Sequence, residues 1–218
     1  MAYELIDTGG SRSFPEGHEL LVRASGKGDA ILIVGAGAAQ ALPKLPAAER
    51  YTAILIELGH EPLGVHTGES RGDEGSNVLG FARFRLGSAD ATALVELVRQ
   101  PRTSEAAIAE ATKIFESAGL QVAVCGDFAG RIVDRLVRPY YNAALRRLDE
   151  GLASADDLDK TLRLGLGYPE GPISLLERTG LEHHYDVTQQ LFETYGDPAY
   201  APARRARVAK QRAGSGKR

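Results

Sequence analysis

The chain has 218 residues, of which 43 % are hydrophobic and 25 % are charged, so it can bury a core and is not disordered over its whole length. Its net charge of −3 indicates no preference for nucleic acid or for a membrane. A single cysteine, Cys125, excludes an internal disulfide, and we expect it to be a small core residue. The first residues carry no signal-peptide pattern. We therefore expect a soluble, cytoplasmic protein.

The chain up to Cys125 alternates between strand and helix patterns. Strands are expected, in chain order, over residues 3–6, 19–22, 30–34, 52–56 and 120–125. The third and fourth of these are continuous apolar runs, which are typical of strands buried on both faces of a parallel sheet. A proline-interrupted helix is expected over 38–50, a long polar loop over 59–77, and a helix between Ser104 and Gly119. The alternation predicts an α/β layer with a mainly parallel sheet.

From Gly130 onward the strand pattern disappears. A helix is expected over 132–148, a second after the capping box at Ser154, a third from Pro172 and a fourth over 181–195. Residues 203–218 include seven basic residues and no acidic residue, and we expect this segment to be a frayed, solvated end. The predicted organisation is an α/β domain over 1–127, a helical domain over 128–202 and a basic tail over 203–218.

Three motifs stand out in the helical part. They are Gly130-Arg-Ile-Val-Asp-Arg-Leu136, Pro139-Tyr-Tyr-Asn-Ala-Ala-Leu145 and Leu164-Gly-Leu-Gly-Tyr-Pro-Glu-Gly-Pro172. In order and spacing they resemble the C-terminal domain of 3-hydroxyacyl-CoA dehydrogenases, over residues 126–202. The resemblance implies a truncated, Rossmann-like α/β domain followed by an all-helical dimerisation domain. It also implies NAD as cofactor, 3-hydroxyacyl-CoA oxidised to 3-oxoacyl-CoA, and a homodimer through residues 130–200.

The resemblance also implies candidate catalytic residues. The family removes the hydroxyl proton with a His–Glu pair while hydride leaves the carbon, and Glu96 takes the position of that glutamate. The family's histidine falls on Ala82, or on Phe84 in an ungapped alignment, and neither side chain can carry a proton. His60 lies near the position of a family serine.

Asp134 takes the position of a family asparagine. This exchange removes two hydrogen-bond donors and adds a charge. A surface ion pair between Asp134 and Arg138, four residues apart on one helix, is the alternative interpretation.

A second set of candidates concerns the cofactor. Gly35-Ala-Gly37 follows a predicted strand and Glu57 lies 22 residues after Gly35, which imitates the dinucleotide fingerprint. Gly35, Gly37 and Glu57 are therefore the candidate cofactor-binding residues. The third glycine of the fingerprint is replaced by Gln40, and a plain strand-to-helix turn is the alternative.

His60 and His66, in the long polar loop, could supply a substitute base or, with Glu69, bind a metal; the alternative is two exposed loop histidines, and no metal is expected. The other histidines are expected at the surface: His18, His183 and His184. Three functions stay open. The chain is a degenerate family member with weak or no activity alone, an active oxidoreductase with a loop histidine as base, or an interaction module that pairs with a full-length relative.

Overall fold

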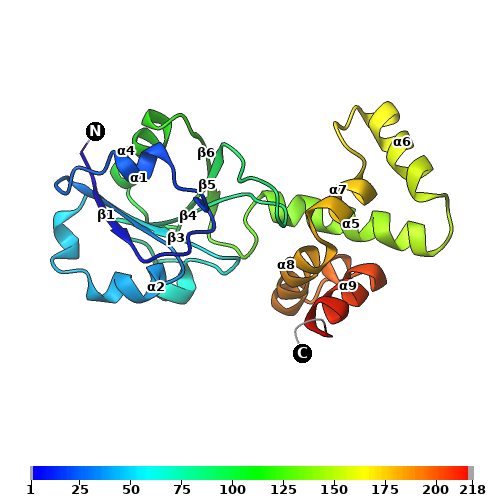
Figure 1. The fold of residues 1–218 in the computed structure, drawn as a ribbon. Helices are drawn as coiled ribbons and strands as arrows, with labels where there is room; N and C mark the ends of the chain where they lie inside the picture. Colours follow the sequence, from blue (N-terminus) through cyan, green and yellow to red (C-terminus); the bar gives the residue numbers. More distant parts are fainter. Residues whose placement is uncertain (1, 216–218) are drawn as a thin grey trace. The chain divides into compact units, whose positions relative to one another are not determined.

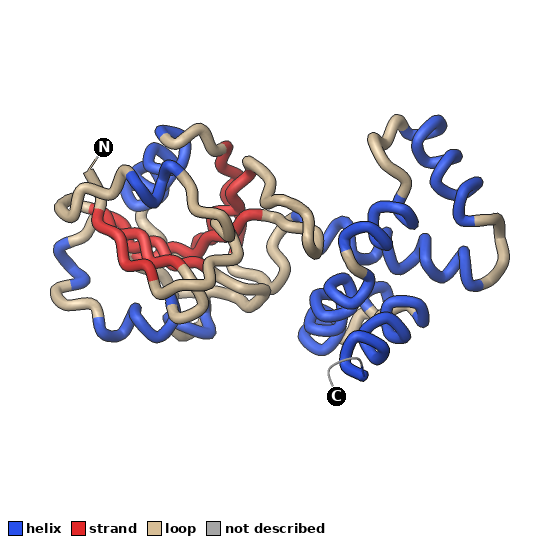
Figure 2. Tube along the Cα trace, in the orientation of Figure 1, coloured by secondary structure: helices blue, strands red, loops and turns tan. Residues whose placement is uncertain are grey.

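The computed structural model describes residues 2–215 and divides into two compact units (Figure 1). The first holds the chain up to Phe84 together with Ala91–Arg131, and the second holds Arg85–Asp90 with the chain from Ile132 onward. Figure 2 shows strands in the first unit and helices in the second. We describe each unit by itself.

A six-stranded sheet forms the centre of the first unit. Its strands are β1 (Glu4–Asp7), β2 (Ala30–Val34), β3 (Ala53–Glu57), β4 (Val78–Arg83), β5 (Leu94–Arg99) and β6 (Gln121–Gly126). They lie side by side in chain order, and every pair is parallel except β4 with β5. Residues 84–93 join this antiparallel pair without a crossover helix, because a parallel connection needs a dozen or more residues. The predicted α/β class and mainly parallel sheet are confirmed.

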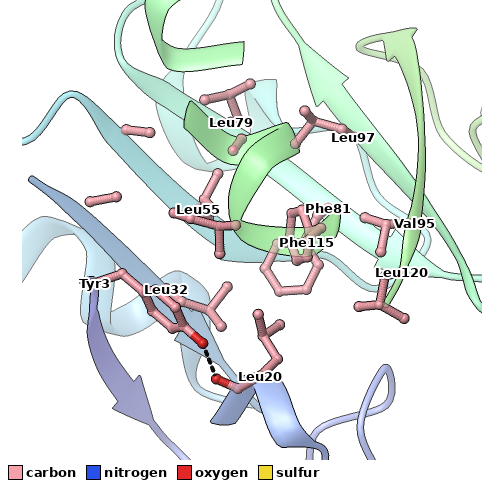
Figure 3. Close-up of a cluster of buried hydrophobic side chains, with 14 of the residues drawn as sticks. Tyr3, Leu20, Leu32, Leu55, Leu79, Phe81, Val95, Leu97, Phe115 and Leu120 are labelled. Atoms are coloured by element: carbon pink, nitrogen blue, oxygen red, sulfur yellow. Dashed lines mark hydrogen bonds between the residues drawn. The ribbon is translucent and has the colours of Figure 1, made fainter. Parts of the chain in front are cut away.

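Helices and short turns cover both faces of this sheet. They are α1 (Glu19–Val22), α2 (Ala38–Ala41), η1 (Leu42–Lys44), η2 (Ala48–Arg50), α3 (Gly64–Thr67) and α4 (Glu105–Ser117). The first face of the sheet, which carries Leu32, Leu55 and Phe81, packs against Leu20 of α1 and Phe115 of α4 (Figure 3). As expected, the Ser104 side chain caps α4, where it accepts a hydrogen bond from an amide of the first turn.

The second face of the sheet carries Ile33, Ile54 and Val98 and packs against Ala38 of α2 and Leu63 of α3. β2 and β3 are buried along their whole length, as their continuous apolar runs predict. Successive strand residues point to opposite faces, so these two packing layers together account for the runs.

Two local predictions in this unit differ from the structure. Residues 19–22 form the helix α1 and not a strand, because the His18 ring accepts a hydrogen bond from the Leu20 amide at 3.1 Å and caps the turn. The helix expected over 38–50 is divided into α2, η1 and η2, since Pro43 and Pro46 cannot continue a helical hydrogen-bond pattern.

The second unit contains helices and no strand among its described residues. Its elements are α5 (Val133–Asp149), α6 (Ala155–Leu166), α7 (Pro172–Thr179), α8 (Leu181–Tyr195), η3 (Pro198–Tyr200) and α9 (Arg204–Ser215). The four helices expected from the sequence correspond to α5–α8. None of the helices among residues 2–215 is both long and apolar enough to cross a membrane.

The expected frayed end is wrong for residues 204–215, which form α9. Ala206 is fully buried, and Arg204 and Arg205 lie 2.7 and 2.9 Å from the Asp149 carboxylate of α5. Lys210 pairs with Asp186 of α8 at 2.7 Å. The basic residues therefore attach α9 to the helical unit. The last three residues of the expected tail lie outside the described residues.

Candidate functional site

Glu96 lies in the middle of β5, the strand next to the edge strand β6. Val95 and Leu97 of β5 belong to the first face, so Glu96 between them points to the second face. In the antiparallel ladder Glu96 is paired directly with Ala82 of β4. Cross-strand partners have Cβ atoms about 5 Å apart, so a histidine at position 82 would reach Glu96. The position opposite the glutamate carries only a methyl group.

Glu96 instead forms a buried ion pair with Arg131. The two side chains are 3 % and 4 % exposed, and Arg131 Nε lies 3.6 Å from Glu96 Oε2. Arg131 Nη2 also donates to the carbonyl of Gly59 at 2.6 Å, and the amide of Gly130 donates to the carbonyl of His60 at 3.0 Å. A buried carboxylate needs an opposite charge, and this arginine supplies a permanent one.

Sequence reasoning missed Arg131. It lies 35 residues after Glu96 and follows Gly130 in a connecting segment that no periodic pattern marks. The one available signal was the glutamate itself, because a carboxylate on a strand with buried neighbours requires a partner of opposite charge.

Cys125 lies on β6, where its thiol interacts with the charges of Glu96 and Arg131. Burial is the main reason that the pKa of the thiol is raised to about 11, and the Glu96 carboxylate raises it further. The thiol therefore stays protonated near neutral pH and packs with the second face, as expected for a core residue.

The two histidines of the polar loop have protein partners. The His60 ring contacts the guanidinium of Arg12. His66 Nε2 lies 3.1 Å from Glu61 Oε1, and the His66 side chain is only 14 % exposed. The expectation of two exposed loop histidines is therefore wrong. Among residues 2–215 no group of histidine, cysteine and acidic side chains is arranged to hold a metal ion.

The loop after β2 brings the predicted cofactor residues together, but their polar groups form hydrogen bonds within the chain. The carboxylate of Glu57 accepts hydrogen bonds from the amides of Gly35 at 2.7 Å and Ser13 at 2.6 Å. The amide of Ala36 donates to the carbonyl of Gly9, and the amide of Gly37 donates to the Thr8 hydroxyl at 2.9 Å. The amides that a dinucleotide pyrophosphate would need are thus already used.

Charge and helix length also disfavour a pyrophosphate at this loop. A cavity of about 320 Å³ lies beside it and is lined in part by Arg12 and by the carboxylates of Glu57 and Glu61. Two negative charges there would repel a phosphate. α2 has only four residues and offers a weak helix dipole. The residues present do not fit the pyrophosphate of NAD at Gly35–Gly37.

Asp134 lies in the helical unit, on the first turn of α5. Its carboxylate accepts a hydrogen bond from Arg138 Nε at 2.7 Å, and both side chains are buried. The expected pair exists, but its expected surface position is wrong. Arg138 Nη1 lies 3.1 Å from His184 Nδ1, and His184 Nε2 lies 3.0 Å from Oδ1 of the Asn142 side chain.

These contacts determine the protonation state of His184. Nδ1 accepts from the guanidinium of Arg138, so Nε2 carries the proton and donates to Asn142. Burial, together with the charge of Arg138, lowers the pKa of His184 to about 3. The residue is 1 % exposed, so its expected surface position is also wrong. It joins α5 to α8 as a neutral side chain.

Comparison with known proteins agrees with this architecture. Residues 130–217 match the family model described as 3-hydroxyacyl-CoA dehydrogenase, C-terminal domain. An α/β unit precedes this helical unit in the chain. This order is the fold of a dehydrogenase with a helical C-terminal domain. The helical unit therefore matches the C-terminal domain of 3-hydroxyacyl-CoA dehydrogenases, and the chain is similar to dehydrogenases of that family.

Individual relatives support the same family. A 3-hydroxybutyryl-CoA dehydrogenase of Mycobacterium tuberculosis is 40 % identical over 111 residues, which are 50 % of this chain and 38 % of that protein. The mitochondrial hydroxyacyl-coenzyme A dehydrogenase of Sus scrofa is 36 % identical over 109 residues, or 46 % of this chain and 35 % of that protein. The crystal structure of (S)-3-hydroxybutyryl-CoA dehydrogenase from Ralstonia eutropha aligns with a TM-score of 0.68 at 25 % identity, covering 83 % of this chain and 64 % of that chain. The sequence matches thus span little more than a third of these curated relatives.

Proposed function

We propose that this chain is a family member that keeps the fold and the assembly surface but has no dehydrogenase activity of its own. One observation carries the proposal: Glu96 faces Ala82 across the strand ladder and pairs with Arg131. Removal of the hydroxyl proton needs a base, and a positioned base contributes about 10²–10⁴ in rate. Arginine cannot act as that base near neutral pH, because its guanidinium stays protonated.

The state of the cofactor loop supports the same proposal. Although the family implies NAD, the amides around Gly35 and Gly37 are bonded within the chain and Glu57 lies among them. Hydride transfer requires a cofactor whose reactive carbon is fixed against the substrate. Without a place for the pyrophosphate at this loop, the chain does not anchor NAD there.

The assembly part of the proposal is a homodimer through residues 130–200. α6 buries only Asp159 within its own unit, and it leaves Leu164 and Leu166 at 76 % and 63 % exposed. A cavity of about 440 Å³, lined by apolar side chains that include Tyr140 and Tyr168, lies in the same unit. Exposed apolar side chains of this size are typical of protein interfaces.

Light scattering at micromolar concentration tests this assembly. We expect the mass of a dimer, and a monomer would contradict the proposed homodimer. Leu164→Lys is the matched variant, because it places a charge on the exposed face without a buried change, and it should shift the mass toward the monomer. Pairing with a full-length relative is the alternative assembly, and a mixed dimer formed in preference to the homodimer would favour it.

The alternative catalytic function is an oxidoreductase that uses a loop histidine as base. It requires that His60 leaves Arg12, or that His66 leaves Glu61, and contacts the substrate instead. A steady-state assay with NADH and acetoacetyl-CoA on the wild type, His60→Ala and His66→Ala separates the two functions. We expect no turnover above the protein-free rate in any of them. Wild-type turnover that either substitution abolishes would establish the alternative.

A thermal-shift titration with NADH and acetoacetyl-CoA tests ligand binding independently of catalysis. A ligand at a hundred times its dissociation constant stabilises a protein by about 2.7 kcal/mol. The proposal predicts no shift with NADH. A shift with acetoacetyl-CoA alone would show that the chain still binds the acyl-CoA, and shifts with both ligands would contradict the proposal.

A further inference from the structure

The ion pair of Glu96 and Arg131 suggests more than the loss of a histidine. We propose that Arg131 is a blocking residue: it holds the Glu96 carboxylate in the place of an imidazole, so that a histidine restored at position 82 does not by itself re-form a His–Glu pair. This inference rests on the proposed function, in which Ala82 occupies the position of the missing base.

Two contacts fix the guanidinium beside Glu96. Arg131 Nε lies 3.6 Å from the carboxylate, while Nη2 donates to the carbonyl of Gly59 at 2.6 Å. The amide of Gly130 is bonded to the carbonyl of His60, so the backbone before the arginine is held by the same loop. The side chain is 4 % exposed, so one hydrogen bond and one ion pair hold the buried guanidinium beside the glutamate.

The backbone of Arg131 supports a specific role for its side chain. Its φ is +50°, in the left-handed region that residues other than glycine rarely adopt. Such a conformation is unfavourable for a residue with a Cβ atom and persists where surrounding contacts impose it. Here the imposed conformation directs the guanidinium to Glu96 and Gly59.

The electrostatic consequence for a histidine at position 82 is definite in sign. A carboxylate within about 4–6 Å raises the pKa of an imidazole, and a positive charge at that distance lowers it, each by about one unit or more. With Arg131 present, the carboxylate is already paired, and the guanidinium offsets its effect on the pKa of the imidazole. The histidine therefore stays neutral and is not oriented by Glu96.

Nuclear magnetic resonance titration of three variants tests the inference. Ala82→His keeps the arginine, and Ala82→His with Arg131→Asn removes it, since asparagine tolerates positive φ. Phe84→His is the matched control, because it introduces a histidine directly after the same strand, at a position not paired with Glu96. The new imidazole resonance is identified against the wild-type spectrum, and its pKa is measured in each variant.

We expect a pKa no higher than about 6.5 in Ala82→His, where the two charges offset each other, a pKa about one unit above 6.5 in the double variant, and a pKa near 6.5 in Phe84→His. A pKa raised above 6.5 in Ala82→His alone would overturn the inference. The titration needs no catalysis, so its outcome is independent of the wild-type assay that tests the proposed function.

A second measurement covers the case in which a histidine at position 82 prevents folding. Urea unfolding of Glu96→Gln, Arg131→Asn and their double variant gives the coupling between the two side chains. If Arg131 holds Glu96, the double variant is less destabilised than the sum of the single variants. Additive effects would contradict the blocking role.

Discussion

Replacing Glu96 with glutamine should strongly destabilise the first unit, although the proposed function gives the residue no catalytic role. The substitution keeps the shape of the side chain and removes the charge, so Arg131 becomes an uncompensated buried cation. Breaking a buried ion pair from one side costs about 3–5 kcal/mol. The separation of 3.6 Å between Nε and Oε2 is longer than a hydrogen bond, which favours the lower end, about 3 kcal/mol.

Urea unfolding, followed by hydrogen exchange of the backbone amides of β4–β6, measures the loss of unfolding free energy in the first unit separately from the helical unit. For a chain of this size about 3 kcal/mol corresponds to a decrease in Tm of about 6–12 °C. Glu105→Gln is the matched control, since Glu105 pairs with Arg99 at 3.4 Å but is 86 % exposed. That change should cost less than about 1 kcal/mol.

A loss below about 1 kcal/mol in Glu96→Gln would refute the reasoning, because the buried guanidinium would then not depend on the carboxylate. A full loss in the control would show instead that the measurement responds to any removed charge. The dehydrogenase assay should be unchanged in Glu96→Gln, since the wild type has no imidazolium for the carboxylate to stabilise.

Three further predictions concern the elements around the two units. Burial and a neighbouring guanidinium lower the pKa of His184 to about 3, so the unfolded state binds one more proton than the folded state below about pH 6.5. The free energy of unfolding of the helical unit should therefore fall by up to about 1.4 kcal/mol per pH unit as the pH decreases. Urea unfolding of His184→Gln should show a shallower decline with pH. Asp159→Ala should cost about 2–3 kcal/mol in thermal unfolding, because Asp159 accepts two amide hydrogen bonds at the start of α7, whereas exposed Asp156→Ala should change little. Gly35→Ala should destabilise the first unit in a thermal melt, since φ is +98° and a Cβ would lie 2.4 Å from the carbonyl oxygen of Gly9; unchanged stability would contradict this packing.

Elements formed by local sequence signals could be predicted. The apolar runs of β2 and β3 and the Ser104 cap of α4 are each visible within a few residues. Elements that depend on distant partners could not. α9 reads as a solvated basic segment until Asp149, more than fifty residues earlier, is known to face its arginines.

The candidate site shows the same division. Gly35 and Glu57 have the spacing of a dinucleotide motif, but only the structure shows that they bond to each other. The position of Glu96 opposite Ala82 follows from strand register, which one sequence does not determine, and the pairing with Arg131 follows from the path of a connecting segment. Spacing thus predicts which residue types can meet, and packing determines whether they remain available for a ligand.

A single-turnover experiment tests the central claim most directly. The protein is mixed in excess over NADH and acetoacetyl-CoA, so that hydride transfer is observed without product release. We predict no loss of NADH absorbance beyond the protein-free reference over minutes, because the position opposite Glu96 holds a methyl group and the carboxylate is paired with Arg131. Oxidation of NADH at about 1 s⁻¹ or faster, within the ordinary range of enzymes, would contradict the account.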